Sequence, residues 1–383
     1  VEQSGENLSH NPIMGNYENW KQNYWVFTIT KVSDKLRTVL QRNDICVEQY
    51  QEESIYKFLE IFQKLKVDSH TYAVIELFLS EFCRTSCPKL AYDLIIEAFS
   101  MYPDIVKLPH IKSSFEKKII NEQQQLNNCP VCSGKGFPYH TAPAYLINTF
   151  QSDFLPAKLW MKCECCGNLY TRYFPKKFFN RKNQLKVITP HQNIEQKLAS
   201  DVSIRMLRTW CDMLQNMKQY TKGKNILEIG VGKGALIATA IEMGYPIDCV
   251  EIEEDVAQNI ADLLQHPVIC CDFLDLPEEK TYDIISMGDV IEHLDDPRKG
   301  LEKARRLLKE DGVIWISTPN YNSAFNQLNR NCTAMWDEPW HITYFSREGL
   351  EKLLSEVGFD VLDYRISNHY NGSMEMIVQK KKN

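Results

Sequence analysis

A glycine-rich turn follows a short apolar run at residues 226–234, which read ILEIGVGKG. Ile226, Leu227 and Ile229 form the pattern of a buried strand, and the next segment, ALIATAIEMG, is typical of a helix. Glycine lets the backbone turn sharply and approach a ligand closely, while the first N–H groups of a helix are unpaired. The order of strand, glycine turn and helix therefore predicts a ligand-binding loop in an α/β fold.

Acidic residues around this loop narrow the choice of ligand. Gly230, Gly232 and Ala235 alone also fit the dinucleotide pattern G-x-G-x-x-G/A. Glu228, however, precedes the first glycine by two residues. Its carboxylate would repel a pyrophosphate, but not an ammonium or a sulfonium. Glu251 ends a second apolar stretch about twenty residues later, where it suits the two hydroxyls of a ribose. These acids disfavour a nicotinamide or flavin enzyme.

The motifs together resemble one enzyme family. Asp272 and Phe273 supply an acid and a ring suited to an adenine, and YDIISMGDVIEHLDDP follows. This order resembles the class I S-adenosylmethionine-dependent methyltransferases over roughly residues 200–379. A nucleotide-binding fold with other chemistry is the alternative. The resemblance implies that S-adenosylmethionine is held by Glu228, Gly230, Gly232 and Gly234 at its methionine part, by Glu251 at the ribose, by Asp272 and Phe273 at the adenine, and by Asp289.

Apolar strands and helices alternate through the second half of the chain. The strands are predicted at 226–229, 247–251, 267–271, 282–287, 313–318, 359–366 and 374–379. This rhythm predicts an α/β fold with a doubly wound, Rossmann-like parallel sheet and helices on both faces. The family resemblance implies that the sheet has seven strands in all. It also implies that strand 374–379 runs antiparallel and lies next to strand 313–318. A helix near 193–219 is expected to lead into the first strand.

Length and local sequence patterns together predict three domains. A chain of 383 residues, 44% hydrophobic and 25% charged, suits a globular protein with two or three domains. Residues 1–120 carry apolar stripes of helical period at 51–66, 71–82 and 88–103, which predict an α-helical N-terminal domain. The polar stretch NEQQQLNN leads to a zinc-binding module at 121–190, and the methyltransferase domain takes 191–383.

The expected location and partners follow from what the sequence lacks. No run of eighteen apolar residues and no secretory signal is visible, so 13 cysteines indicate a reducing, cytoplasmic location. A net charge of −6 disfavours a general nucleic-acid binder. The expected partner is a small-molecule acceptor, with no nucleic acid and no membrane. A protein partner or self-association through the helical domain stays open.

Two C-x-x-C knuckles lie about thirty residues apart. Four thiolates in such a pair can hold tetrahedral zinc without a water ligand, which makes the site structural. A redox pair is the alternative, and Cys165 is a spare cysteine. The ending CECCGNLYTRYFP also resembles zinc-binding modules that precede methyltransferase domains in some bacterial sugar-modifying and natural-product enzymes, which implies a role in shaping substrate binding. The predicted zinc ligands are Cys129, Cys132, Cys163 and Cys166.

Candidate catalytic side chains gather in two segments. GDVIEHLDDP follows the predicted strand 282–287, at the edge where open α/β sheets bind ligands. Its Asp289, Glu292 and His293 fall at i, i+3 and i+4, one face of a helical turn. His341 lies later in an aromatic stretch. Two acids and two imidazoles would suit octahedral Mg²⁺ or Mn²⁺. Alternatively, His293 or His341 is a general base, or these residues are structural.

The spacing D-x-x-E-H with a distant histidine resembles two groups of enzymes. These are the ubiquinone-pathway O-methyltransferases and the small-RNA 3′-terminal 2′-O-methyltransferases, which hold a divalent ion with an E-x-x-E-H face. Asp289 departs from the glutamate of that pattern. We therefore expect O-methylation of a small biosynthetic intermediate, such as a sugar or polyhydroxylated natural product. Sugar C-methylation, N-methylation, metal-dependent RNA 2′-O-methylation and a non-catalytic S-adenosylmethionine-binding scaffold are the alternatives.

Overall fold

The computed structural model describes residues 55–57, 59–60, 64, 68–103, 105, 118–144, 153–179, 204–329, 333–367 and 371–382. The chain divides into two units, Val1–Glu116 and Lys117–Asn383. The second unit contains both the cysteine-bearing segment and the glycine loop, so the division into three domains stays a prediction. No helix among the described residues is long and apolar enough to cross a membrane.

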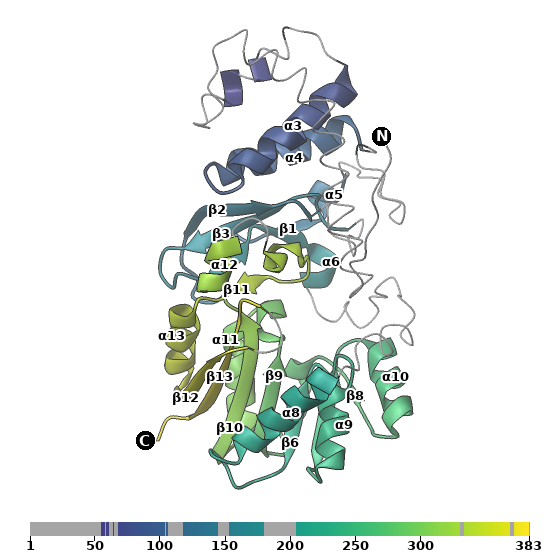
Figure 1. Ribbon diagram of the computed structural model, residues 1–383, viewed down its shortest axis with the longest axis vertical. Helices are drawn as coiled ribbons and strands as arrows, with labels where there is room; N and C mark the ends of the chain where they lie inside the picture. The colour runs from purple at the N-terminus through teal and green to yellow at the C-terminus, as the bar shows by residue number, and fades with distance from the viewer. Residues whose placement is uncertain are drawn as a thin grey trace, which may run out of the picture. The chain divides into compact units, whose positions relative to one another are not determined.

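The described part of the first unit is built on two helices, α3 (Ser69–Cys83) and α4 (Pro88–Met101) (Figure 1). Asp68 caps α3, since its side chain accepts a hydrogen bond of 3.0 Å from the backbone N–H of Thr71. Proline at the start of α4 sacrifices an N–H that would be unpaired anyway. The two helices share a buried apolar cluster with Ile55 and Leu59. The helices predicted at 71–82 and 88–103 are confirmed, while most of 51–66 lies outside the described residues.

The second unit begins with a small β-rich body, here called the cysteine module (residues 118–144 and 153–179). Strand β1 (Gln123–Gln125) pairs with β5 (Tyr173–Pro175) between the short helices α5 (Lys118–Asn121) and α6 (Lys176–Phe179). Its main sheet has the order β11-β4-β3-β2. The bounds of these strands are β2 (Gly136–Ala142), β3 (Lys158–Cys163), β4 (Leu169–Thr171) and β11 (Thr343–Tyr344). Strand β11 follows the glycine loop in the sequence, and it nevertheless forms the edge of the sheet of the cysteine module.

The larger sheet of this unit has seven strands in the order β12-β13-β10-β9-β6-β7-β8. Strand β13 runs antiparallel between β10 and β12, while the pairs from β10 to β8 are parallel. This is the predicted seven-stranded, doubly wound α/β sheet, including its antiparallel strand. The strands are β6 (Ile226–Ile229), β7 (Ile247–Glu251), β8 (Ile269–Cys270), β9 (Tyr282–Gly288), β10 (Leu308–Pro319), β12 (Phe359–Ile366) and β13 (Ser373–Lys380).

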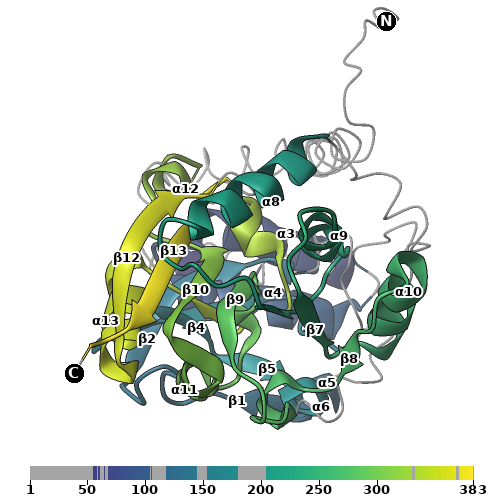
Figure 2. The ribbon, with the colours of Figure 1, turned by 90° about the horizontal axis from the view of Figure 1, so that it is seen from below.

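Helices cover both faces of this sheet (Figure 2). The helices α8 (Ile204–Met217), α9 (Ala235–Glu242) and α10 (Glu254–Leu264) share one apolar core with the sheet, which includes Leu214, Ile237 and Trp315. The helices α11 (Pro297–Leu307) and α13 (Arg347–Val357) contact each other on the opposite face, and α12 (Ala324–Asn329) follows β10. The predicted helix 193–219 is described only from Ile204. Its earlier part lies outside the described residues.

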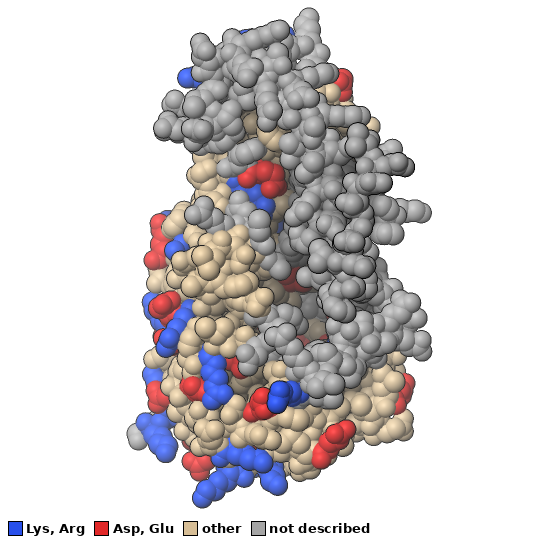
Figure 3. Space-filling model, viewed as in Figure 1, with Lys and Arg blue, Asp and Glu red and all other residues tan. Residues whose placement is uncertain are grey.

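The face of the second unit seen in Figure 3 carries basic and acidic side chains side by side. Among the described residues, ion pairs join Lys380 with Glu310 at 2.7 Å and Lys309 with Asp283 at 3.0 Å. Charges of both signs are interspersed on the face in view.

Candidate active site

The glycine turn after β6 has the backbone that only glycine adopts easily. Gly230, Gly232 and Gly234 have φ angles of 74°, 50° and 74°, in the left-handed region that disfavours side chains. Gly234 stands at the N-terminal cap of α9. A Cβ at Gly232 would meet nothing within 4 Å, so the loop borders open space at this point. The loop therefore presents backbone N–H groups and a helix N-terminus to a ligand.

Glu251 at the end of β7 organises this loop. One carboxylate oxygen accepts a hydrogen bond of 3.0 Å from Val231 N–H, and the other accepts from Ile252 at 2.7 Å and Glu253 at 3.0 Å. Burial raises the pKa of Glu251, and these backbone N–H groups counteract part of that rise. The Gly232 N–H also lowers this pKa, so four backbone N–H groups face the carboxylate. Glu251 thus holds the loop, and its role toward a ribose stays a prediction.

Glu228 on β6 supplies a test of the predicted cofactor. The side chain is 5% exposed, and its Oε2 atom has no hydrogen-bond partner. Burial, followed by the neighbouring charge of Glu251, raises the pKa of Glu228 well above its usual range. A buried carboxyl of this kind is stabilised in its charged form by a cation. An ammonium group at the glycine loop would satisfy it, which fits the methionine part of S-adenosylmethionine.

Asp272 and Phe273 lie directly after β8, at the same edge of the sheet. The Asp272 carboxylate caps the short helix Phe273–Asp275 by accepting a hydrogen bond of 2.9 Å from Leu274 N–H. Phe273 is 4% exposed, so its ring is part of the core and offers little free face to an adenine. The role of both residues toward an adenine stays a prediction.

Asp289 does not share a helical face with Glu292 and His293, so that prediction is wrong. Asp289 has a φ of 53°, and the helical turn, a 3-10 helix, covers only Ile291–His293. The Asp289 N–H donates to the Ser317 carbonyl at 2.9 Å, which fixes the residue beside β10. Its carboxylate accepts a hydrogen bond of 3.5 Å from the Ser317 hydroxyl, and burial raises the pKa of Asp289 to about 6. With this left-handed backbone, Asp289 does not join the predicted set of metal ligands.

Glu292, His293 and His341 do come together, although His341 is distant in sequence. Ligand atoms of the three residues lie within 4.8 Å of one another, and Asp289 is not among them. His341 Nε2 lies 3.9 Å from Glu292 Oε1, and the two imidazole centroids are 4.5 Å apart. Ile342 N–H donates to the Glu292 carbonyl at 2.8 Å, which joins the two segments. We call these three residues the acceptor triad.

Glu292 is held at one oxygen and unpartnered at the other. Its Oε2 accepts a hydrogen bond of 3.0 Å from the Thr318 hydroxyl, while Oε1 has no partner. Burial, followed by the charge of Asp289, raises the pKa of Glu292 well above its usual range. Thr318 was missed from the sequence, where its one signal is a hydroxyl residue near the end of an apolar strand. A fixed carboxyl with one open oxygen can bind a proton, a hydroxyl or a metal ion.

Tyr344 determines the tautomer of His341. The Tyr344 hydroxyl donates its single hydrogen to the Met335 carbonyl, so toward His341 it accepts. His341 Nδ1 lies 3.0 Å from that hydroxyl and therefore carries the ring hydrogen. Burial lowers the pKa of His341 well below its usual range, so the ring is neutral at pH 7. Nε2 is left with a free lone pair directed toward Glu292, as a base or a metal ligand requires.

The cysteine module packs against the segment that carries His341, here called the aromatic segment (residues 333–345). His140 stacks on Trp336 with ring centroids 4.1 Å apart, and Trp160 lies 4.3 Å from Tyr344. Lys158 at the start of β3 donates to backbone carbonyls of this segment. Burial lowers the pKa of Lys158 to about 7. No sequence signal distinguishes Lys158 from the other lysines, and it was missed.

The four predicted cysteines form a cluster. Sγ atoms of Cys129, Cys132, Cys163 and Cys166 all lie within 4.8 Å of one another. Cys129 and Cys166 are 3.7 Å apart, and Cys132 and Cys163 are 3.4 Å apart. Zn–S bonds of about 2.3 Å in a tetrahedron would put the sulfurs about 3.8 Å apart, so the cluster fits the ion. Cys165 is exposed and is not a member of the cluster.

The electrostatics of the cluster favour a cation. The contact between the Cys129 and Cys166 sulfurs lowers the pKa of Cys166 to about 5 and raises the pKa of Cys129. Burial raises the pKa of Cys132 to about 12, and the Gly134 backbone N–H lowers it in part. Thiols this close cannot all ionise without a cation, whereas bound zinc deprotonates coordinating thiols outright. The donor set therefore suits a structural metal.

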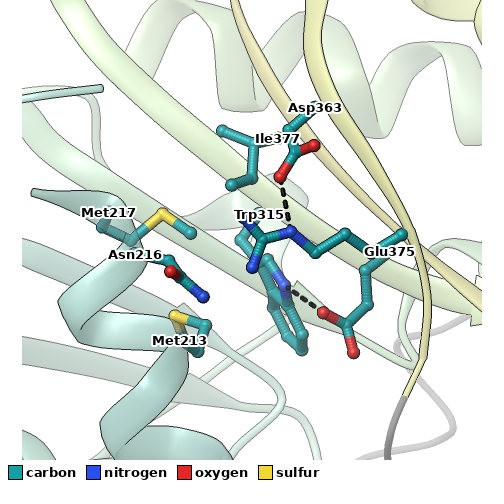
Figure 4. A pocket seen from close by; sticks show the side chains of 8 residues that line it. Met213, Asn216, Met217, Trp315, Asp363, Glu375 and Ile377 are labelled. Atoms are coloured by element: carbon teal, nitrogen blue, oxygen red, sulfur yellow. Dashed lines mark hydrogen bonds and ion pairs between the residues drawn. The ribbon is translucent and has the colours of Figure 1, made fainter. Parts of the chain in front are cut away.

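Among the described residues, two cavities that lie away from the acceptor triad are considered as acceptor sites. The first has a volume of about 20 Å³ and is lined by α8 and strands β10, β12 and β13 (Figure 4). In it, Trp315 donates to Glu375 at 3.3 Å, and Arg365 bonds Asp363 at 2.6 Å. That volume holds about one water molecule, so it cannot take an acceptor. The second, about 280 Å³, lies at the ends of β10 and β12 and beside α12.

Comparison with known proteins finds one family model that spans both the glycine loop and the acceptor triad. Residues 202–364 match a family model described as a methyltransferase domain. The ubiquinone biosynthesis O-methyltransferase of Coxiella burnetii is 32% identical over 177 residues, which cover 41% of this chain and 75% of that protein. The sarcosine/dimethylglycine N-methyltransferase of Aphanothece halophytica is 27% identical over 192 residues, 45% of this chain and 65% of that protein. The chain thus spans slightly less than two thirds of the second relative.

Two solved methyltransferase structures are similar to part of this chain, with low TM-scores. The 1,6-didemethyltoxoflavin-N1-methyltransferase of Burkholderia thailandensis, solved with 1,6-didemethyltoxoflavin and S-adenosylhomocysteine, has a TM-score of 0.39 and 18% identity. The match covers 49% of this chain and 83% of the Burkholderia enzyme. The magnesium protoporphyrin IX methyltransferase of Synechocystis, with bound S-adenosylhomocysteine, has a TM-score of 0.38 and 14% identity over 53% of this chain and 94% of that one.

Proposed function

Because the chain belongs to the class I S-adenosylmethionine-dependent methyltransferases, we propose that it methylates a hydroxyl of a small polyhydroxylated molecule at the acceptor triad. The observation that carries the proposal is the free lone pair of His341 Nε2, 3.9 Å from the open oxygen of Glu292. A hydroxyl is a poor nucleophile until its proton is removed, and the neutral His341 ring can accept that proton at Nε2. An amine acceptor that is already neutral needs no such base.

Residues of the glycine loop and of the ends of β6 and β7 would hold the cofactor. S-adenosylmethionine supplies a methyl group that is already activated on a sulfonium. Glu228 would hold the ammonium of its methionine part, and Glu251 would hold the ribose while fixing the glycine loop through Val231. These residues lie at the carboxyl ends of β6 and β7, the edge where open α/β sheets bind ligands, and β9 pairs with β6. They would hold the cofactor at that edge. Orientation of two reactants can supply most of the rate acceleration.

His341 would take the proton of the acceptor hydroxyl at Nε2. Tyr344 fixes the ring through Nδ1, so Nε2 keeps one direction. The low pKa of His341 keeps the ring neutral and able to accept a proton at pH 7. Glu292 Oε1 lies 3.9 Å from His341 Nε2, so the carboxyl would lie beside the imidazolium that forms. His293 faces the His341 ring edge to face and would contact the acceptor or its water.

A metal-assisted route is the second candidate, and the same triad supports it. Two imidazoles and a carboxylate within 4.8 Å of one another are a donor set for a divalent ion. The absence of Asp289 from this group leaves one oxygen donor fewer than the sequence predicted, which favours Mn²⁺ over Mg²⁺, because imidazole is a softer ligand. The ion would lower the pKa of an acceptor hydroxyl directly. Chelation separates the two routes.

We also propose that the cysteine cluster holds one structural zinc ion. Four thiolates complete the tetrahedral shell, which leaves no position for a reactant. The backbone of the two knuckles is closed by hydrogen bonds from Cys129 N–H to Gly134 and from Gly167 N–H to Cys163, at 2.9 and 3.1 Å. Such a site stabilises the module and takes no part in chemistry.

The decisive experiment is methyl transfer from isotopically labelled S-adenosylmethionine, read by mass spectrometry. The acceptor panel is catechol and methyl α-glucoside, which carry vicinal hydroxyls, and sarcosine, which carries an amine. Label on a hydroxyl compound supports the proposal. Label on sarcosine alone would show N-methylation. No label on any compound, despite calorimetric binding of S-adenosylhomocysteine, would leave the binding scaffold as the better description for these acceptor classes.

A further inference from the structure

Lys158 is a buried ammonium whose hydrogen-bond partners are all backbone carbonyls. The side chain is 7% exposed. Its Nζ donates to the Pro339 carbonyl at 2.7 Å, to the His341 carbonyl, and to the Glu338 carbonyl at 3.5 Å. An ammonium has three hydrogens, so these three acceptors use them all. Burying a charge is costly unless it is fully hydrogen-bonded, so this arrangement needs a reason.

The rings around Lys158 fix the position of its head. Nζ lies 4.7 Å from the Trp160 ring centroid and 5.8 Å from that of Phe174. Aromatic faces attract a cation, and the effect grows when water is excluded. Both rings belong to the cysteine module, on β3 and β5. The cysteine module therefore contacts the ammonium through aromatic rings, and the aromatic segment contacts it through backbone carbonyls.

The carbonyls belong to the turn that carries His341. Within that turn Trp340 N–H donates to Glu338 Oε1 at 3.0 Å, and Ile342 N–H donates to the Glu292 carbonyl at 2.8 Å. Lys158 closes the turn from the opposite side. Strand β3 begins at Lys158 and ends at Cys163, one of the clustered cysteines. One strand thus connects the cysteine cluster with the backbone of His341.

We propose that Lys158 is a positioning residue that holds the backbone of His341 so that Nε2 faces the acceptor triad. The proposal rests on the proposed function for its catalytic meaning, since His341 is the base there. Lys158 itself contacts no reactant, because its three hydrogens are directed at carbonyls. Without it, the turn keeps its bonds to Glu292 and Tyr344 but loses the contact that fixes its start. A displacement of about 1 Å at a reacting group can cost about a hundredfold in rate.

The test uses the full-length chain and reads His341 directly. In protein labelled with ¹⁵N-histidine, NMR distinguishes a ring with hydrogen on Nδ1 from one with hydrogen on Nε2, and His341→Gln assigns the signal. The variants are Lys158→Met, which keeps the apolar stem, and Lys158→Arg, which keeps the charge. The matched control is Lys162→Met on the same strand, whose Nζ lies 5.4 Å from the Tyr139 ring and not at the turn.

Wild type and Lys162→Met should show a single His341 signal with hydrogen on Nδ1. Lys158→Met should shift or split that signal, and Lys158→Arg should restore part of it. Binding of S-adenosylhomocysteine should stay within about twofold, because the glycine loop is untouched. Turnover of catechol should fall about 10–100-fold with little change in the KM for S-adenosylmethionine. A folded Lys158→Met protein with the wild-type His341 signal overturns the proposal, whatever the turnover.

A second measurement covers the case in which Lys158→Met does not fold. In wild-type protein labelled with ¹⁵N-lysine, the Lys158 ammonium should exchange its hydrogens with water far more slowly than Lys162. A Lys158 signal that exchanges as fast as Lys162 would show that the carbonyl contacts do not persist, and it overturns the proposal. Because neither NMR readout needs an acceptor, a failed methyl-transfer assay and a failed positioning role remain distinguishable.

Discussion

The backbone N–H of Val231 donates a 3.0 Å hydrogen bond to the side chain of Glu251. This bond ties the glycine loop after β6 to the end of the neighbouring strand β7. The acid predicted to hold a ribose is thus also the residue that holds the loop in shape. Its removal would affect the cofactor twice, through the lost contact and through a looser loop.

Replacing Glu251 with alanine should weaken binding of S-adenosylhomocysteine by about 10–100-fold. The loss of a charge-assisted hydrogen bond costs about 1.5–3 kcal/mol, and about 1.4 kcal/mol is tenfold in affinity. Isothermal calorimetry measures the change. Glu242→Ala, at an exposed position on α9, is the control and should bind as wild type does. Tight NAD binding with no response to S-adenosylhomocysteine would refute the assigned cofactor.

Replacing Cys132 with serine should lower the zinc content from about one ion per chain and destabilise the cysteine module. Zinc binding in such a site is also folding free energy, so the lost thiolate weakens both. Elemental analysis of protein purified without added metal gives the content. Cys165→Ser is a matched control, because Cys165 is exposed and outside the cluster. Wild-type protein with less than about a tenth of an equivalent would reject the zinc site.

Replacing His341 with glutamine should reduce methyl transfer to catechol by about 10²–10⁴-fold while S-adenosylhomocysteine affinity stays near wild type. The reason is the loss of the Nε2 lone pair. If the base acts alone, chelator treatment leaves wild-type turnover intact. If a divalent ion is used, turnover disappears with chelator and returns with Mn²⁺. His70→Gln, in α3 of the first unit, should leave turnover unchanged. Full activity in both His341→Gln and chelated enzyme would contradict both routes.

Replacing Glu76 with glutamine should stabilise helix α3 above neutral pH. Burial, followed by the charge of Glu97, raises the pKa of Glu76 from 4.5 to about 8. Because the folded state binds this proton more tightly, the contribution of Glu76 to stability is complete below about pH 4.5 and lost as pH rises through 8. Hydrogen exchange in α3 should therefore show less protection in wild type than in Glu76→Gln at pH 9, by at least about 1 kcal/mol, and not at pH 4.

Glu97→Gln serves as the comparison for that experiment. It removes only the second cause of the shift, so its effect should have the same sign and be smaller. Equal protection of wild type and Glu76→Gln at both pH values would show that burial does not raise the pKa of Glu76.

Apolar runs allowed all seven strands of the large sheet to be predicted, although β10 begins at Leu308, five residues before the predicted start at 313. Strand β9 was expected at 282–287 and covers Tyr282–Gly288. Buried parallel strands are continuous apolar runs, so the local sequence is sufficient. The two-residue strand β11 could not be predicted, because its pairing with Leu169 and Tyr170 depends on the tertiary structure and not on its own residues.

The candidate site was predictable in composition but not in geometry. The spacing of Glu292, His293 and the cysteine knuckles identified residues that the structure brings together. Regular spacing also placed Asp289 on a helical face, but its left-handed backbone prevents this. The sequence holds no sign of that conformation, since aspartate adopts it only in a suitable tertiary setting. Lys158 was equally hidden, because its partners are backbone atoms of a segment far along the chain.

The sheet of the cysteine module is complete only when strand β11, far along the chain, has paired with β4. Ser346 N–H, just after β11, bonds to Asn168 beside β4, a residue 178 positions earlier. During synthesis on the ribosome, the edge of β4 therefore stays unpaired until five of the seven strands of the large sheet have been made. Closing so long a loop is slow, and an open edge favours wrong pairing.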